Sequence, residues 1–244
     1  MKKLNILLTL SILTLAFTIS QEIFNPDTET YLKNKLKDSV VYVVNENENG
    51  GGTGFLLKNE EGREYIVTNN HVCSHTQVDG MVKVKTDEKV IKRKVIDMSQ
   101  DADLCIIEAG FDQEPLKMAK KYTVGNKAYV MGHPYLNPLT FVSGDIVAKQ
   151  KISIVKYEMT EDSPPCDGKN QHPATLSMFI FAVNVCLQDY DSLSTTISTY
   201  PGNSGSPMVD DKGDVIGVIF AGNNYTNWGH AVPLEDLKAF INKY

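Results

Sequence analysis

From residue 39 onward the chain consists of short runs of β-branched and aromatic residues, and turns rich in glycine or charged residues separate most of them. Runs of this length, bounded in this way, predict β-strands. Many short strands with almost no helical spacing between them indicate a β-sandwich or β-barrels. The strands are expected at residues 40–44, 53–57, 64–68, 82–86, 90–98, 104–108, 127–131, 138–149, 152–159, 177–185, 195–199, 207–209, 215–221 and 230–233.

Two stretches have a different pattern. A weakly amphipathic run opens at Pro26 and continues through Leu36, which predicts a short helix leading into the domain. Residues 234–244 place apolar side chains at helical spacing behind a proline, and we expect a C-terminal helix packed on a barrel. Residues 112–122 are expected to be a linker. Residues 161–194 are the least strand-like part, and a portion of them is expected to be an extended loop.

Residues 1–20 have the layout of a secretory signal peptide, with a charged start, an apolar stretch rich in leucine and isoleucine, and small or polar residues up to Ser20. An uncleaved membrane anchor is the alternative, but the apolar run is short and diluted by polar residues. No cysteine stands at its end, which argues against a lipoprotein. We expect a secreted or periplasmic protein without stable membrane association after cleavage, and residues 21–38 are an N-terminal segment or a propeptide.

The net charge of −6 argues against a nucleic-acid partner, because no basic cluster stands clear of compensating acids. The run HVCSH at residues 71–75 suggests a metal site, but no second cluster of ligands accompanies it. We therefore expect neither a metal nor another cofactor.

Export makes disulfides possible, and the four cysteines can pair in three ways. Cys166 and Cys186 bracket a polar segment that a bridge between them would staple. Cys73 and Cys105 each lie two residues beyond a candidate catalytic group. They are expected to be close together, either as a bridge or as two buried thiols.

The sequence PGNSGSP at residues 201–207 places a serine between glycines, and the motif lies between two apolar runs. This density of glycine and proline excludes a helix and marks a tight turn with Ser204 at its apex. Such a turn also aims consecutive N–H groups into one concavity, where they can stabilise an oxyanion. A serine hydroxyl is a weak nucleophile by itself, so this interpretation requires a histidine and a carboxylate.

The sequence contains both groups. His71 follows the apolar run at residues 65–67 and is expected at a strand end, where a rigid element can aim it into a cleft. Asp103 stands at the mouth of the apolar strand at residues 104–108. A carboxylate there needs hydrogen bonds, and an imidazole N–H would supply one while fixing the tautomer of the base. Asp101 is the alternative, but only Asp103 adjoins the apolar run directly.

These motifs, in the order His, Asp, Ser, resemble the trypsin-like serine protease superfamily, and most of all its Deg-type and glutamyl-endopeptidase branches. The resemblance runs from about residue 40 to the C-terminus. It implies an all-β, chymotrypsin-like fold of two six-stranded antiparallel β-barrels with a C-terminal helix. The domain would span residues 39–244, with barrel 1 at about 39–115, barrel 2 at about 122–233 and the helix at 234–244. Further supporting motifs are GGGTGF at 50–55, MGHP at 131–134, VSGDIV at 142–147, IGVIFAG at 216–222 and GHAVP at 229–233.

The resemblance implies a serine endopeptidase that acts on protein or peptide substrates through an acyl-enzyme. His71 would take the proton of Ser204, and Asp103 would hold the imidazolium. The N–H groups of Gly202 and Ser204 would form the oxyanion hole. The sequence leaves the natural substrate and the oligomeric state open.

The family's primary specificity pocket maps onto other positions. Ser198 would lie at the pocket floor, where tryptic enzymes carry aspartate, and Ile219 would replace the histidine of glutamyl endopeptidases. These two differences from the family pattern predict a neutral pocket that takes small or medium apolar side chains of the substrate. Phe220, Ala221 and Gly222 would offer their backbone to an extended substrate. His230 either approaches the pocket or has a packing role.

Several departures and rival hypotheses accompany the resemblance. We do not expect the PDZ module that follows the protease domain in Deg-type enzymes, nor regulated assembly of that kind. An esterase of the α/β-hydrolase type is the first rival, but Ser206 replaces the second glycine of its elbow and its triad order differs. A catalytically inactive, protease-shaped binding protein is the second. The filled triad positions favour the enzyme.

Overall fold

A computed structural model describes residues 27–45, 50–86, 89–110, 112–158, 166, 170–175, 182–223 and 225–244.

The first sheet closes into a barrel. Six strands follow the order β1-β4-β5-β6-β3-β2, and a further β1–β2 pairing closes the ring. The short strand β7 pairs with the last two residues of β2, Leu57 and Lys58. Their bounds are Val40–Val44 (β1), Gly51–Lys58 (β2), Glu64–Thr68 (β3), Met81–Lys85 (β4), Val90–Ser99 (β5), Leu104–Glu108 (β6) and Leu116–Lys117 (β7).

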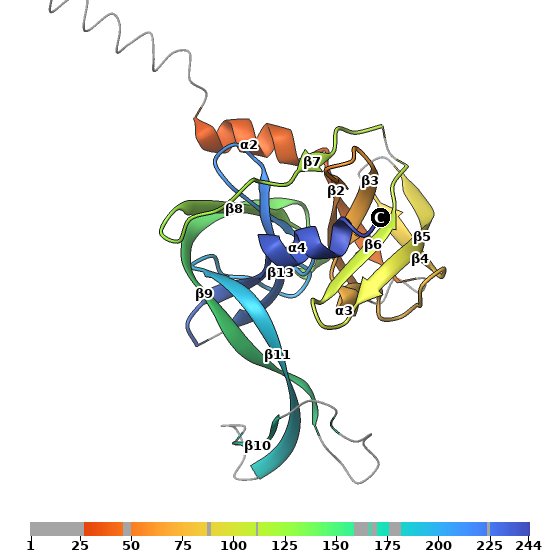
Figure 1. The fold of residues 1–244 in the computed structure, drawn as a ribbon. Helices are drawn as coiled ribbons and strands as arrows, with labels where there is room; N and C mark the ends of the chain where they lie inside the picture. The colour runs from red at the N-terminus through yellow and green to blue at the C-terminus, as the bar shows by residue number, and fades with distance from the viewer. Residues whose placement is uncertain are drawn as a thin grey trace, which may run out of the picture.

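The second sheet closes in the same way. Six strands follow the order β11-β14-β13-β12-β8-β9, the β9–β11 pairing closes the ring, and β10 pairs with β11. The predicted fold, two six-stranded barrels followed by a C-terminal helix, is therefore confirmed (Figure 1). The bounds are Lys127–Gly132 (β8), Thr140–Glu158 (β9), Asn170–Thr175 (β10), Ala182–Thr195 (β11), Pro207–Val209 (β12), Val215–Asn223 (β13) and Trp228–Pro233 (β14).

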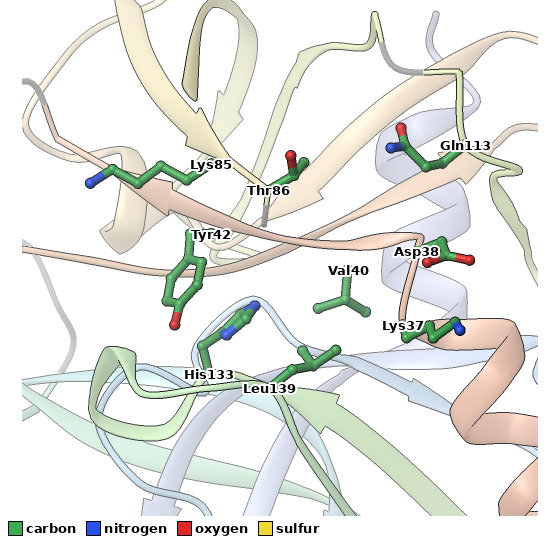
Figure 2. Close-up of a pocket in the computed structure, with 9 residues that line it drawn as sticks. All are labelled: Lys37, Asp38, Val40, Tyr42, Lys85, Thr86, Gln113, His133 and Leu139. Atoms are coloured by element: carbon green, nitrogen blue, oxygen red, sulfur yellow. The ribbon is translucent and has the colours of Figure 1, made fainter. Parts of the chain in front are cut away.

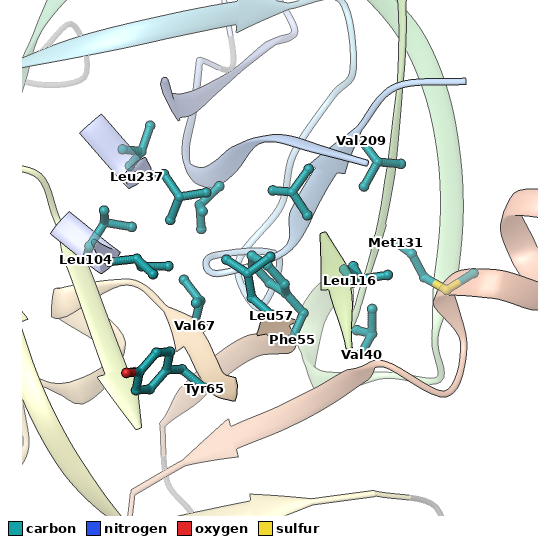
Figure 3. Close-up of a cluster of buried hydrophobic side chains, with 14 of the residues drawn as sticks. Val40, Phe55, Leu57, Tyr65, Val67, Leu104, Leu116, Met131, Val209 and Leu237 are labelled. Atoms are coloured by element: carbon teal, nitrogen blue, oxygen red, sulfur yellow. The ribbon is translucent and has the colours of Figure 1, made fainter. Parts of the chain in front are cut away.

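The barrels are joined by a shared apolar core. Side chains on one face of the strands fill the interior of each barrel, and on strands such as β2, β3, β6 and β13 the opposite face packs between the two barrels. Phe55 and Val67 of barrel 1 and Val209 of barrel 2 belong to this shared cluster (Figure 3). Burial of that apolar surface fixes the position of one barrel against the other, and so of any site built from both.

Two helices extend this shared core. Helix α2 (Thr28–Leu36) buries Leu32 and Leu36 completely, as the weakly amphipathic pattern predicts. Helix α4 (Leu234–Ile241) buries Leu237 and Phe240, and Figure 1 shows it lying in front of the region where the barrels meet. Both predicted helices are confirmed.

The β9–β11 region was not predicted correctly. The expected strands at 138–149 and 152–159 are one 19-residue strand, β9. Strand β11 (Ala182–Thr195) includes the end of the expected strand at 177–185 and extends through the last part of the segment that was expected to be least strand-like. The strand expected at 195–199 is not present, because β11 ends at Thr195. Residues 161–165, 167–169 and 176–181, where part of the extended loop was expected, lie outside the described residues. Strands β9 and β11 form a long hairpin arm that projects from barrel 2 (Figure 1). On the arm the backbone pairing needs few apolar side chains, so the sequence pattern is weak.

Some expectations concern residues that the structure does not describe. The proposed signal peptide, residues 1–20, lies outside the described residues. Within the described part of the chain, no helix is both long enough and apolar enough to cross a bilayer.

Candidate active site

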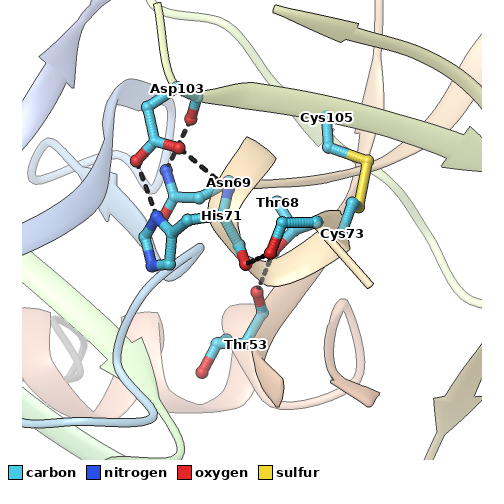
Figure 4. Close-up of a disulfide and its surroundings, with 8 residues drawn as sticks. Thr53, Thr68, Asn69, His71, Cys73, Asp103 and Cys105 are labelled. Atoms are coloured by element: carbon cyan, nitrogen blue, oxygen red, sulfur yellow. Dashed lines mark hydrogen bonds and ion pairs between the residues drawn. A yellow bond between two sulfur atoms is a disulfide. The ribbon is translucent and has the colours of Figure 1, made fainter. Parts of the chain in front are cut away.

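His71 and Asp103 form a pair at one end of barrel 1. Strand β3 ends at Thr68 and leads into the short helix α3 (Asn70–Cys73), so His71 lies in the first turn of this helix, directly behind the end of the strand. The Nδ1 atom of His71 is 2.8 Å from Oδ2 of Asp103, and the backbone N–H of His71 donates to Oδ1 at 3.0 Å (Figure 4). Both carboxylate oxygens therefore hold the same residue. A proton held on Nδ1 leaves Nε2 available as a base.

The backbone around Asp103 is unusual. Asp103 has φ of +49°, a left-handed conformation that aspartate tolerates better than most residues, and its side chain is buried. The side-chain amide of Asn69 donates to the carbonyl oxygen of Asp103 at 2.9 Å. Sequence reasoning missed Asn69, although the residue stands inside the motif that identified His71.

A disulfide joins the two elements that carry this pair. Cys73 at the end of α3 is bonded to Cys105 in β6, two residues beyond Asp103 (Figure 4). Of the two alternatives for these cysteines, the bridge is correct. It also leaves Cys73 unavailable as a thiolate metal ligand. The second predicted pairing, Cys166 with Cys186, is present as well.

The serine turn is held against barrel 1. Gly202 and Gly205 have φ of +94° and +87°, which explains why glycine flanks the serine. The backbone N–H of Thr53, in β2, donates to the carbonyl oxygen of Ser204 at 2.8 Å, and the hydroxyl of Thr53 donates to the carbonyl oxygen of Gly202 at 2.8 Å. A Cβ on Gly205 would collide with the carbonyl oxygen of Thr53.

The segments that carry Ser204 and His71 both pack against strand β2. A Cβ on Gly52 would lie 2.5 Å from the carbonyl oxygen of Ser204 and 2.8 Å from Cγ2 of Val72, the residue after His71. The turn and the histidine helix thus meet over β2. Among the hydrogen bonds of the described residues, none joins the His71 imidazole to the Ser204 hydroxyl.

Two backbone N–H groups of the serine turn are available as hydrogen-bond donors. Among the hydrogen bonds found in the described ranges, none is donated by the N–H of Gly202 or of Ser204. The neighbouring N–H groups of Asn203 and Gly205 are used, by the carbonyl oxygens of Tyr200 and Ile219. The pattern leaves two donors for an anionic oxygen.

The positions expected to bind substrate lie around β13. Ile219 is fully buried inside barrel 2, and Phe220 is buried between the barrels with its ring centroid 5.4 Å from that of Tyr190. Ala221 is half-buried, and Gly222 is exposed. Ser198 donates to the carbonyl oxygen of Asn227 at 3.2 Å, at the turn between β13 and β14.

His230 packs on the outer face of the β11–β14 sheet. Its Nδ1 lies 3.1 Å from the hydroxyls of both Ser192 and Ser194, and burial lowers its pKa. It also lines a cavity of about 500 Å³ between the base of the arm and the end of β13, together with Ile152, Ala221 and others.

Tyr190, on the arm, lies near the catalytic candidates. Burial raises the pKa of Tyr190 to about 12, and the negative charges of Asp103 and Asp101 add to the effect. The side-chain amide of Gln188 donates to the carbonyl oxygen of Gln100 at 3.2 Å. The base of the arm therefore touches the loop that presents Asp103, a contact that no local sequence signal indicates.

Two barrels that place a histidine–aspartate pair beside a glycine-flanked serine define the trypsin-like class of serine proteases. The comparison with family models agrees, because residues 52–218 match the model of the trypsin-like peptidase domain. The chain belongs to this family.

Known proteases and solved structures resemble the chain. It is 27% identical over 200 residues to a probable periplasmic serine endoprotease, DegP-like, of Chlamydia trachomatis serovar D, covering 79% of this chain and 33% of that protein. It is 24% identical over 197 residues to the serine protease Do-like HtrA of Bacillus subtilis, covering 78% and 38%. The match thus spans about a third of the length of these relatives. The active form of the Rv3671c protease from M. tuberculosis shares the fold, with a TM-score of 0.64 at 20% identity over 87% of this chain and 83% of that one.

Proposed function

We propose that the protein is a serine endopeptidase whose catalytic residues are His71, Asp103 and Ser204. The observation that carries the proposal is the pair of hydrogen bonds from His71 to Asp103, at 2.8 and 3.0 Å. The helix that carries His71 meets the serine turn over β2. A surface histidine has no need of a buried carboxylate that binds both its ring and its backbone. A general base has that need, because its tautomer and orientation must be fixed.

The reaction would follow from these roles. Nε2 of His71 takes the proton of the Ser204 hydroxyl as its oxygen attacks the peptide carbonyl, and Asp103 stabilises the imidazolium. The N–H groups of Gly202 and Ser204 receive the developing oxyanion. The imidazolium gives its proton to the leaving amine, and water then hydrolyses the acyl-enzyme by the same steps. The contact between Nε2 and the hydroxyl would form with substrate bound, as catalytic hydrogen bonds often do.

We also infer that substrates bind as extended peptides along β13. Strand β12 pairs with β13 only as far as Val218, and backbone bonds from the serine turn reach Ile219. Beyond that point the same edge of β13, at Phe220 to Gly222, has no strand partner among the described residues. An extended peptide can add to such an edge as a further strand. The substrate side chain just before the scissile bond would be small or medium-sized and apolar, since Ser198 and Ile219 give the pocket no charge.

Export to the periplasm or the cell exterior is part of the proposal. It is supported by the signal-like residues 1–20, by two disulfides and by a relative described as periplasmic. Disulfides persist in oxidising compartments.

The proposal is tested with Ser204→Ala, assayed on fluorescently labelled casein and with a fluorophosphonate that labels activated serines. The variant should lose at least about 10⁴-fold in kcat and all labelling, because the remaining residues act only as a unit. Ser143→Ala, an exposed serine on β9, is the matched control and should behave like the wild type. Full activity in Ser204→Ala would remove Ser204 from its role. A wild-type protein that neither cleaves nor labels but binds peptides would favour the inactive binding protein.

A further inference from the structure

The turn after β8 has a strained backbone. The 3₁₀ turn η1 (Pro134–Leu136) contains two consecutive non-glycine residues in the left-handed region, Tyr135 with φ of +54° and Leu136 with φ of +56°. A single such residue is uncommon, and two in succession persist only where the surroundings hold them. The segment from His133 to Asn137, called here the 133–137 turn, is therefore held in place by contacts outside itself.

Tyr42 supplies those contacts from the other barrel. It lies on β1, and its ring stacks on the imidazole of His133 with 3.5 Å between the centroids and 24° between the planes (Figure 2). Its hydroxyl lies 2.6 Å from the carbonyl oxygen of Asn137 and 3.0 Å from that of Leu136, so its one hydrogen is shared between them. Nδ1 of His133 lies 3.1 Å from the same Asn137 oxygen. One side chain of barrel 1 thus touches both ends of the turn.

The opposite side of the turn rests on Gly202. A Cβ on Gly202 would collide with the carbonyl oxygen of His133 and would lie 2.8 Å from the backbone nitrogen of Tyr135. The N–H of Tyr135 donates to the carbonyl oxygen of Pro201 at 2.5 Å. The Pro201 carbonyl and the Gly202 N–H belong to one planar peptide group, so this bond sets the direction of that N–H.

Thr53 closes the network. Its hydroxyl oxygen accepts the N–H of His133 at 3.0 Å, and its hydrogen goes to the carbonyl oxygen of Gly202 at 2.8 Å. The Thr53 side chain therefore holds both the 133–137 turn and the peptide group that follows Gly202. A displacement of the turn would rotate the Gly202 N–H.

We propose that Tyr42 is a positioning residue for the oxyanion-binding peptide, which it controls by holding the 133–137 turn against Gly202. The inference rests on the proposed function, since it concerns how one of its oxyanion donors is aimed. Tyr42 need not touch the substrate. Its loss should weaken binding of the tetrahedral transition state and leave binding of the extended substrate nearly unchanged.

The kinetic experiment compares Tyr42→Phe and Tyr42→Ala on a chromogenic peptide, with Tyr31→Phe and Tyr31→Ala on helix α2 as matched controls. Tyr42→Ala should lower kcat by about 10- to 100-fold with KM within about twofold, because a donor is misplaced rather than removed. A peptide aldehyde, whose adduct carries an oxyanion, should bind more weakly by the same factor. Tyr42→Phe keeps the stacked ring and should lose less. Wild-type kcat in Tyr42→Ala, or a loss matching only the unfolded fraction, would overturn the proposal.

Hydrogen exchange gives a readout that does not depend on activity. In Tyr42→Ala, amide exchange should accelerate in peptides covering residues 130–138 and 199–206, and it should be unchanged there in Tyr31→Ala. Unchanged exchange at 199–206 would overturn the proposal even if kcat fell. If the wild type neither cleaves peptides nor reacts with a fluorophosphonate, the proposed function fails. In that case faster exchange at residues 199–206 would still support the positioning of the Gly202 peptide by Tyr42.

Discussion

The histidine–aspartate half of the candidate site is held by bonds inside barrel 1, whereas the serine half is a turn of barrel 2 held by contacts from both barrels. His71 and Asp103 lie on α3 and at the start of β6, elements joined by the Cys73–Cys105 disulfide. The serine turn has no covalent tie of this kind. It depends on Thr53 across the interface and on the 133–137 turn behind it.

In the proposed mechanism, this difference separates two tasks within one site. The base must keep one tautomer and one orientation, and the hydrogen bonds and the disulfide within barrel 1 provide both. The oxyanion donors must match an atom that exists only during the reaction, and their aim depends on how the barrels dock. Changes in the first half should therefore act on proton transfer, and changes around the second on the geometry of the turn.

Among the changes that separate the two halves, the largest effect is expected from Asp103→Asn, which keeps the shape of the first half and changes which imidazole nitrogen carries the proton. The asparagine can still accept the N–H of His71, but its amide would favour the wrong imidazole tautomer, so kcat should fall by about 10⁴-fold. The measurement is kcat on a peptide substrate, with circular dichroism to verify folding.

Asp101→Asn is the control for that change. Asp101 is exposed and two residues away, and its variant should keep kcat within about twofold, because screening makes a surface charge a small contribution. If both variants lost activity equally, the base would depend on the charge of the loop and not on one carboxylate.

The candidate residues that are encoded locally could be proposed from the sequence. His71, Asp103 and Ser204 each stand in a motif next to an apolar strand. The partners of the serine turn could not be predicted in this way, because Thr53 and Gly202 are 149 residues apart and Tyr42 and Asn137 are 95 apart. No local pattern encodes a contact that forms only when two barrels dock.

A similar limit explains the error in the fold. The barrel strands were predicted because their buried faces require apolar residues, as in the run at Leu104–Glu108. The β9–β11 arm carries exposed residues such as Asp189 and Asp191, and backbone pairing holds it together. Its sequence therefore resembles that of a loop.

The next effect concerns the disulfide of the first half. Replacing Cys73 and Cys105 together by alanine should lower the free energy of unfolding by about 2–4 kcal/mol, because the unfolded chain regains the freedom of the loop that the bridge closes. Urea unfolding measures this loss, and kcat should fall as α3 loses its tie to β6.

The pair Cys166 and Cys186 on the arm offers the comparison. Its double alanine variant should also be less stable, while kcat stays within about twofold, because that bridge touches neither half of the site in the described part of the chain. An equal loss of kcat in both double variants would show that the disulfide on the arm supports the site as much as the Cys73–Cys105 disulfide does.

The smallest effect is expected at Ser206, in the serine half. Its hydroxyl is buried and has no hydrogen-bond partner among the described residues, and it lies against Gly132. An unsatisfied buried hydroxyl costs about 1–3 kcal/mol, so Ser206→Ala should raise the free energy of unfolding by about 1 kcal/mol. Ser39 is the matched control, because it is also buried but donates to the carbonyl oxygen of Glu114 at 2.7 Å. Ser39→Ala should therefore lower stability. Urea unfolding of both variants decides the matter, and a loss of stability in Ser206→Ala would show that the serine turn uses that hydroxyl after all.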